Sequence, residues 1–389
     1  MEQRPELTAL MLTDLGSAQL WAGRFEAARS TLSVAVQAAD GPATAFPRHE
    51  ALGRLALIDF LHGRPGQAEA HAREAIAEAD RSGLPVPDRT GVARLVLAAV
   101  AIDRDDLTAA RDHLDLAAAT SAAGRDPVVA VELAVLRSRM LCAAGDARAA
   151  LLALDSMAKR PLVSTEPSPW VSDRVSMATA AAYLADGDPK AAVRVFEDRR
   201  AHGLHGLVAE AWARAAAGES ERALRVLDGL PDRGRGPALD AWILLTRAQA
   251  VDALGRSAAA ESLVLRALTA ARPHQLRRPF LEAGPWFGRL LRRRAGLAAQ
   301  HAWLTGSLSR RSADARAPEE PSGPRPQALS TREHDVLERL AQLMSTEEIA
   351  ADLYLSVNTV KTHLKSIYRK LDATRRGEAV RRARELGLL

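Results

Sequence analysis

One nine-residue stretch decides the fold of the C-terminal part of the chain: LSVNTVKTH, residues 355–363. Ser356 can cap a helix through its hydroxyl oxygen, and Leu355 and Val360 stand where a hydrophobic staple would form across the helix start. Apolar residues continue from there at helical spacing: Val360, Leu364, Ile367 and Leu371. Because such a stripe has to be buried, the sequence predicts a helix that begins after Ser356 and packs one face against its neighbours.

Two more helix starts precede this stretch. Each is a serine followed three residues later by a glutamate, which is the sequence of a capping box: Ser330 with Glu333, and Ser345 with Glu348. Met344 and Ile349 flank the second box as a staple pair. Only residues 354 and 355 separate the second helix from the third, the short connection of a helix-turn-helix. Residues 329–389 are therefore predicted to form a compact four-helix module.

The side of the third helix opposite Val360 carries hydrogen-bond donors and positive charges. At about 100° per residue, helical geometry groups five residues there: Asn358, Lys361, Thr362, Lys365 and Arg369. Lysine can donate to guanine, asparagine can pair with adenine, and the threonine methyl can touch a thymine methyl in the major groove of DNA. This face is suited to reading base edges, with a merely solvated charged face as the alternative.

Charge is distributed unevenly within the module. Residues 361–384 contain nine Lys or Arg against two Asp or Glu, whereas residues 330–352 contain two against six. Three of the five lysines of the chain lie in the third helix: Lys361, Lys365 and Lys370. Such a concentration of lysines is expected on a surface that faces phosphates. The net charge of the whole chain, +5, is modest by comparison.

Four motifs in this module resemble the LuxR-type helix-turn-helix family: LSTRE at 329–333, EIA at 348–350, SVNTVKTH at 356–363 and IYRKL at 367–371. The resemblance and the donor-bearing face together imply base contacts from Asn358, Lys361, Thr362 and Lys365. Phosphate contacts are implied for Thr359, Arg369 and Lys370. Leu343 and the segment 372–376 depart from the family, which has glycine at both places. The last helix of the family pairs two copies, so Val380 and Ala383 are expected either to form a dimer contact or to pack within one module.

A repeat runs through residues 1 to about 270. Its reference residues recur at intervals of 31 to 42 residues: Gly23, Gly63, Asp105, Gly145, Gly187, Gly218 and Gly255. An alanine follows each of them by five residues: Ala28, Ala68, Ala110, Ala150, Ala192, Ala223 and Ala260. Nine residues on stand Leu32, Ala72, Leu114, Leu154, Phe196, Leu227 and Val264. This spacing predicts helical hairpins that stack into a solenoid with a concave face. A nonrepeating helical domain is the alternative.

The repeat resembles tetratricopeptide repeats, although most intervals exceed the usual length of about 34 residues. Connectors at 81–88 and 161–169 account for part of the extra length. The segment RRPFLEAG, residues 277–284, resembles the end of the helical-repeat region in the large ATP-binding, MalT-like LuxR regulators. That resemblance implies a repeat region that senses an inducer or a partner. Because the chain lacks a GxxxxGK[ST] phosphate loop, we expect either a fragment of such a regulator or a shortened relative.

Composition excludes several other classes of protein. The chain has 389 residues, 47% of them hydrophobic, and a single cysteine, Cys142, so a disulfide framework is excluded. Residues 306–328 lack apolar periodicity and are expected to be a flexible linker between a repeat domain at 1–305 and the module at 329–389. No membrane span or export signal is recognisable, and a cytoplasmic location is expected. His202 and His205 have no cysteine nearby, so no metal site, cofactor or enzymatic activity is expected.

These patterns predict an all-α protein, a tetratricopeptide-like solenoid joined to a LuxR-type helix-turn-helix module. The predicted function is a bacterial transcription regulator that binds double-stranded promoter DNA as a homodimer and contacts RNA polymerase. Its repeat domain would receive a small-molecule or protein effector, with activation as the expected sign of control. Two alternatives stay open. One is a helical-repeat interaction scaffold with a degenerate DNA-binding module. The other is region 4 of a sigma factor, which has a similar fold, although the long repeat domain argues against it.

Overall fold

The computed structural model describes residues 5–39, 41, 44–89, 91–120, 122–158, 168–197, 203–231, 235–293, 303–304, 331–342, 344–353, 357–371, 373 and 376–385. Every regular element in these ranges is a helix, which confirms the all-α prediction. The chain divides into two compact units, residues 1–311 and 312–389. The linker predicted at 306–328 lies outside the described residues, and its two boundaries stay predictions. No helix in the described ranges is long and apolar enough to cross a membrane.

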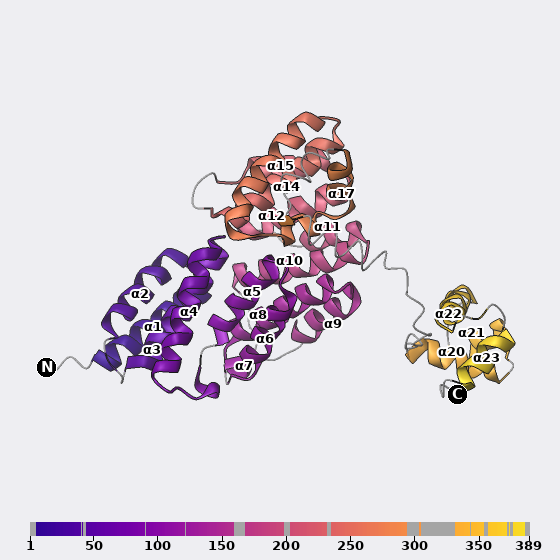
Figure 1. Ribbon diagram of the computed structural model, residues 1–389, viewed down its shortest axis with the longest axis horizontal. Helices are drawn as coiled ribbons and strands as arrows, with labels where there is room; N and C mark the ends of the chain where they lie inside the picture. Colours follow the sequence, from indigo (N-terminus) through magenta and orange to yellow (C-terminus); the bar gives the residue numbers. More distant parts are fainter. Residues whose placement is uncertain are drawn as a thin grey trace. The chain divides into compact units, whose positions relative to one another are not determined.

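The first unit is built from helical hairpins that follow one another along the chain (Figure 1). The described ranges contain seven: α1 (Pro5–Trp21) with α2 (Phe25–Ala38), α3 (Ala45–Leu61) with α4 (Pro65–Arg81), α5 (Gly91–Asp103) with α6 (Leu107–Ala118), α8 (Pro127–Ala143) with α9 (Ala147–Ala158), α10 (Pro169–Ala185) with α11 (Pro189–Glu197), α12 (Leu204–Ala216) with α13 (Ser220–Asp228), and α14 (Pro237–Ala253) with α15 (Ser257–Ala271). The short helices η2 (Val86–Asp88) and α7 (Ala122–Arg125) lie in connectors. The 3₁₀ turn η4 (Arg272–His274), α16 (Arg278–Glu282) and α17 (Gly284–Arg293) follow the last hairpin.

All seven predicted reference residues lie at the turns of these hairpins. Each has a positive φ, between 63° for Asp105 and 87° for Gly145. The backbone closes each turn in the same way. At the first one, the amide of Arg24 donates to the carbonyl of Gln19, which ends α1 with a Schellman-type bond. Glycine is favoured here because it adopts the left-handed conformation without steric cost, and Asp105 is the exception.

The small and large positions of the repeat are buried as expected. Every alanine five residues after a turn is fully buried: Ala28, Ala68, Ala110, Ala150, Ala192, Ala223 and Ala260. The residues nine positions after each turn are buried too, with at most 4% of any of them exposed: Leu32, Ala72, Leu114, Leu154, Phe196, Leu227 and Val264. The alanines let the two helices of a hairpin approach closely, and the second set fills the space between helices. These turns and buried positions confirm the predicted repeat of helical hairpins.

Later hairpins also contact the turns of the first three, which the repeat alone did not predict. The indole of Trp170 donates to the carbonyl of Leu20 at 2.9 Å. The amides of Gly236 and Ala238 donate to the carbonyls of His62 and Gly63, at 2.8 and 3.2 Å. The guanidinium of Arg277 donates to the carbonyl of Arg104. The unit therefore does not consist of nearest-neighbour contacts alone, in contrast to a simple solenoid.

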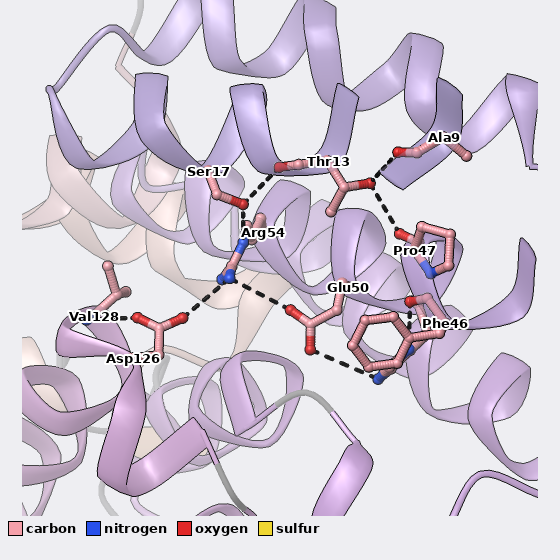
Figure 2. A network of polar contacts seen from close by, with 10 residues as sticks. Ala9, Thr13, Ser17, Phe46, Pro47, Glu50, Arg54, Asp126 and Val128 are labelled. Carbon is pink, nitrogen blue, oxygen red and sulfur yellow. Dashed lines mark hydrogen bonds and ion pairs between the residues drawn. The ribbon is translucent and has the colours of Figure 1, made fainter. Parts of the chain in front are cut away.

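A polar network ties three hairpins together inside this unit (Figure 2). At its centre, Arg54 of α3 donates to the hydroxyl of Ser17 on α1. The same guanidinium lies 3.0 Å from Asp126 and 3.4 Å from Glu50. Asp126 in turn caps α8, because its carboxylate accepts from the amide of Val128 at 2.8 Å. One part-buried guanidinium on α3 thus contacts α1 and the N-terminal cap of α8.

The second unit contains the four predicted helices: α20 (Thr331–Ala341), α21 (Thr346–Asp352), α22 (Val357–Lys370) and α23 (Arg376–Glu385). They enclose a small apolar core that belongs to this unit alone: Val336, Leu337, Leu340, Ile349, Ala350, Val360, Ile367, Leu371, Ala373, Ala379 and Ala383. Each of the four helices contributes to the core. The module can therefore hold its shape through its own packing.

Candidate nucleic-acid interface

The capping box predicted at the start of α21 is present in full. The amide of Glu348 donates to the hydroxyl of Ser345 at 3.2 Å, and the amide of Ser345 donates to the carboxylate of Glu348 at 2.7 Å. These hydrogen bonds lower the pKa of Glu348 below its ordinary value. Met344 packs partly buried against the core that contains Ile349, as the staple required. Ser330 and Ser356, predicted to cap the neighbouring helices, lie outside the described residues.

The inner face of α22 matches the predicted apolar stripe. Val360 and Ile367 are fully buried, Leu371 is 2% exposed, and Leu364 packs against the same core in a partly buried position. Because α22 contacts α20, α21 and α23 through this face, its axis is set by packing rather than by its polar residues.

Polar contacts hold the C-terminal end of α22. The ammonium of Lys370 donates to the carboxylate of Glu333 on α20 at 2.6 Å, and the side chain of Glu333 is only 6% exposed. Beyond the helix, the guanidinium of Arg382 donates to the carbonyl of Leu371 at 3.1 Å, and that of Arg376 donates to Leu340 at 2.7 Å. Lys370, predicted to contact phosphate, is thus part of an internal ion pair.

The other predicted contact residues all belong to α22: Asn358, Thr359, Lys361, Thr362, Lys365 and Arg369. Lys361 has a described side chain, and it is exposed. The side chains of the other five lie outside the described residues, so their contacts with DNA stay predictions. His363, on the same helix, is partly buried.

The last helix, α23, had two predicted roles. Ala379 and Ala383 are fully buried in the core of the module, and Val380 packs partly buried against it. For Ala383, the structure therefore favours packing within one module over a dimer contact. Arg381 and Arg384 are exposed on the same helix.

The surroundings of Cys142 and His205, both in the first unit, shift their pKa values. Burial raises the pKa of the part-buried thiol of Cys142 to about 11, so it is largely protonated at neutral pH and a poor nucleophile. Burial lowers the pKa of His205 to about 4, with Arg174 and His62 adding to the effect. His202 lies outside the described residues. Within the described part of the chain, no cluster of three His, Cys, Asp or Glu residues is arranged to hold a metal ion.

Two family descriptions match the chain. The MalT-like TPR region matches residues 2–296, and the bacterial regulatory proteins of the luxR family match residues 327–383. The first match covers the hairpin unit and the second covers α20 to α22 and most of α23. The division seen in the structure therefore coincides with two separately recognised regions.

Curated relatives match over parts of their length. An HTH-type transcriptional regulator of Mycobacterium bovis is 31% identical over 273 residues, which covers 63% of this chain and 29% of the relative. The probable transcriptional regulatory protein NarL of Mycobacterium tuberculosis is 46% identical over 61 residues, 16% of this chain and 28% of the relative. The HTH-type transcriptional regulator MalT of Klebsiella pneumoniae is 38% identical over 69 residues, which covers 18% of this chain and 8% of the relative. The chain spans less than a third of each relative.

Proposed function

The chain belongs to the bacterial regulators in which a MalT-like TPR region precedes a luxR-family DNA-binding domain, and from this premise we propose that it regulates transcription by binding promoter DNA through α22. The observation that carries the proposal is the exposure of Lys361 on a helix whose opposite face is the module core. A helix fixed in this way can enter the major groove without rearranging its own packing.

The proposed base contacts come from Asn358, Lys361, Thr362 and Lys365, and the proposed phosphate contacts from Thr359, Arg369 and Lys370. Each type suits its role: lysine donates to guanine, asparagine pairs with adenine, and hydroxyls and cations bind phosphate oxygens. Lys370 must bind phosphate while it keeps its ion pair with Glu333, to which its ammonium donates at 2.6 Å. An ammonium has three N–H donors, so it can keep that hydrogen bond and still donate another one to a phosphate oxygen.

For the first unit we propose a sensing role, in which a small-molecule or protein effector binds the stacked hairpins. We further propose that two copies act together on DNA, that the bound protein contacts RNA polymerase, and that its effect is activation. Support for these four points comes from the resemblance to the large LuxR regulators. Since Ala383 belongs to the module core, a pair of copies would have to meet through the outer side of α23.

A titration of the full chain with a labelled DNA duplex at several salt concentrations tests the proposal. Binding through several cations releases counterions, so the logarithm of the affinity should fall with the logarithm of the salt concentration at a slope of about −3 or steeper. The scaffold alternative predicts no binding to duplexes even at low salt. Failure to bind any duplex from a genomic pool at low ionic strength would overturn the regulator proposal.

A further inference from the structure

A small cavity lies between the second and third hairpins of the first unit. Its volume is about 70 Å³, and its walls come from α3, α4, η2, α5 and α6. The floor is apolar, formed by Ala75, Ile76 and Ala79 of α4. Two apolar side chains at its edge, Val86 and Leu116, are exposed to 45% and 41%. Polar side chains complete the lining: His49, Arg89, Arg94 and Thr120. A space of this size with both kinds of wall suits an organic molecule of a few heavy atoms better than a single water.

The connector at 81–88 supplies part of the wall of this cavity. It turns through η2, which places Val86 and the adjacent Arg89 on the lining. The guanidinium of Arg89 is satisfied by the protein, since it donates to the carbonyl of Leu84 at 2.7 Å and to the carboxylate of Asp80 at 2.5 Å. The extra length of this repeat therefore builds one side of the cavity, and the charge of Arg89 is balanced.

Arg94 of α5 also lines the cavity, and its charge is not balanced. Among the described residues, its one polar partner is the ring nitrogen Nδ1 of His113 at 3.4 Å, and no carboxylate lies within ion-pair distance. Burial lowers the pKa of Arg94, and the neighbouring Arg89 charge lowers it further, against the opposing effect of Asp80. Burial and Arg94 likewise lower the pKa of His113, so that its ring is neutral at about pH 7 and can accept from Arg94.

We propose that this cavity binds a small monocarboxylate, with its carboxylate on Arg94 and its short apolar chain against Ala75, Ile76 and Ala79. A guanidinium offers five donors in a planar fork that matches a carboxylate, and one bond to His113 leaves most of them available. An uncompensated cation in a part-buried site gains more from a bound anion than one in open water. The proposal deepens the sensing role and rests on it, because the ligand would be the effector of the first unit.

The lining also discriminates between anions. One unpaired guanidinium balances one negative charge, so a doubly charged phosphate would keep an excess charge next to apolar walls. Phosphate also lacks the apolar part that the α4 floor and Leu116 would cover. A neutral amide of the same shape would fill the floor but lose the charge-assisted bonds to Arg94. Binding in this cavity should therefore require both a single negative charge and a short apolar chain on the ligand.

Calorimetric titration of the full chain with butyrate, butyramide and inorganic phosphate tests the site directly. Butyrate should bind saturably with one site per chain, and butyramide and phosphate should each bind about tenfold more weakly or not at all. Equal affinity for butyrate and butyramide, or no saturable binding of butyrate, would overturn the proposal. DNA is absent from this experiment, so a negative result leaves the proposed DNA binding untouched.

Variants locate the binding in the cavity. Arg94→Gln should weaken butyrate binding about tenfold or more, whereas Arg247→Gln, which removes a part-buried arginine of α14 paired with Asp228, should leave it unchanged. Leu116→Glu, at an exposed position of the cavity mouth, should abolish binding by offering Arg94 a competing carboxylate, whereas Leu116→Gln, which loses only the apolar cover, should weaken binding far less. Because these last two side chains are exposed, they keep the test decisive even where Arg94→Gln fails to fold. Undiminished binding in Leu116→Glu contradicts the site.

Discussion

The most deeply buried ion pair in the described residues joins two separate hairpins. Arg174 of α10 donates twice to Glu132 of α8, at 2.8 and 2.6 Å, and each side chain is only 3% exposed. Taking both charges out of water is costly, and the parallel hydrogen bonds offset that cost only while both partners are present. The pair is therefore a test of how tightly these hairpins are packed.

Arg174→Met should destabilise the protein by about 3 to 5 kcal/mol, because it leaves the carboxylate of Glu132 buried without a partner. The double change Arg174→Met with Glu132→Leu should recover most of that loss. Urea unfolding of the full chain measures both. Arg247→Ala, which breaks the more exposed pair with Asp228, should cost less than about 1 kcal/mol. A loss below about 1 kcal/mol for Arg174→Met would contradict the burial of this pair.

His205 should make the stability of the first unit depend on pH. Its pKa in the folded protein is about 4, below the ordinary value of 6.5, so the unfolded chain binds more protons between these values. The free energy of unfolding must then fall as the pH falls from about 6.5 to 4, by about 3 kcal/mol for this group. His205→Gln removes the titrating ring and should reduce that fall. Unfolding curves of the two proteins that run parallel over this range would rule the effect out.

The hairpin is the level at which the sequence was most informative. A turn residue and the alanine after it act within one hairpin, so their spacing alone predicted the seven turns and the seven close helix contacts at alanine. The structure adds that φ is positive at every one of these turns and that every alanine is buried. The contact of Gly236 with the turn at Gly63 joins segments that lie far apart in the chain, and no periodicity encodes it. For the same reason, neither the pair of Arg174 with Glu132 nor the contact of Arg94 with His113 could be predicted.

Gly236→Ala should loosen the contact between the seventh hairpin and the second. A Cβ at this position would lie 2.2 Å from the carbonyl oxygen of Gly63, a backbone atom that cannot move aside freely. The expected loss of stability is about 1 to 3 kcal/mol, with faster amide hydrogen exchange at Ala238, which donates to Gly63. Gly124→Ala is the matched control, because a Cβ there meets no atom within 4 Å. Unchanged exchange at Ala238 would show that the contact is dispensable.

In the DNA-binding module, the sequence predicted the helix starts and the buried residues more completely than the contacts of the surface side chains. The capping box of Ser345 and the buried stripe of α22 follow from local spacing, and the structure confirms both. The ion pair of Lys370 with Glu333 joins two helices, so local spacing could not reveal it, and the sequence had predicted only a phosphate contact for Lys370. Side-chain contacts on the outer face of α22 stay predictions apart from the exposure of Lys361.

For the molecule as a whole, the two units carry two different chemistries. The first buries charged pairs among packed hairpins and has a part-buried arginine, Arg94, on the wall of the cavity proposed to bind a ligand. The second keeps a small core and an exposed lysine on α22. The two proposals together require that the ligand changes DNA binding, and coupling of that kind acts in both directions. Butyrate should therefore alter duplex affinity in the full chain, and the effect should vanish in Arg94→Gln.

Duplex binding by the Lys361→Ala protein tests the account most directly. Fluorescence anisotropy with a duplex selected from bound genomic fragments should show a loss of about 1 to 3 kcal/mol, or roughly 5- to 150-fold in affinity. Arg384→Ala removes one exposed cation from α23 and should cost clearly less. If Lys361→Ala binds that duplex as tightly as the unchanged protein, α22 does not read DNA in the way described.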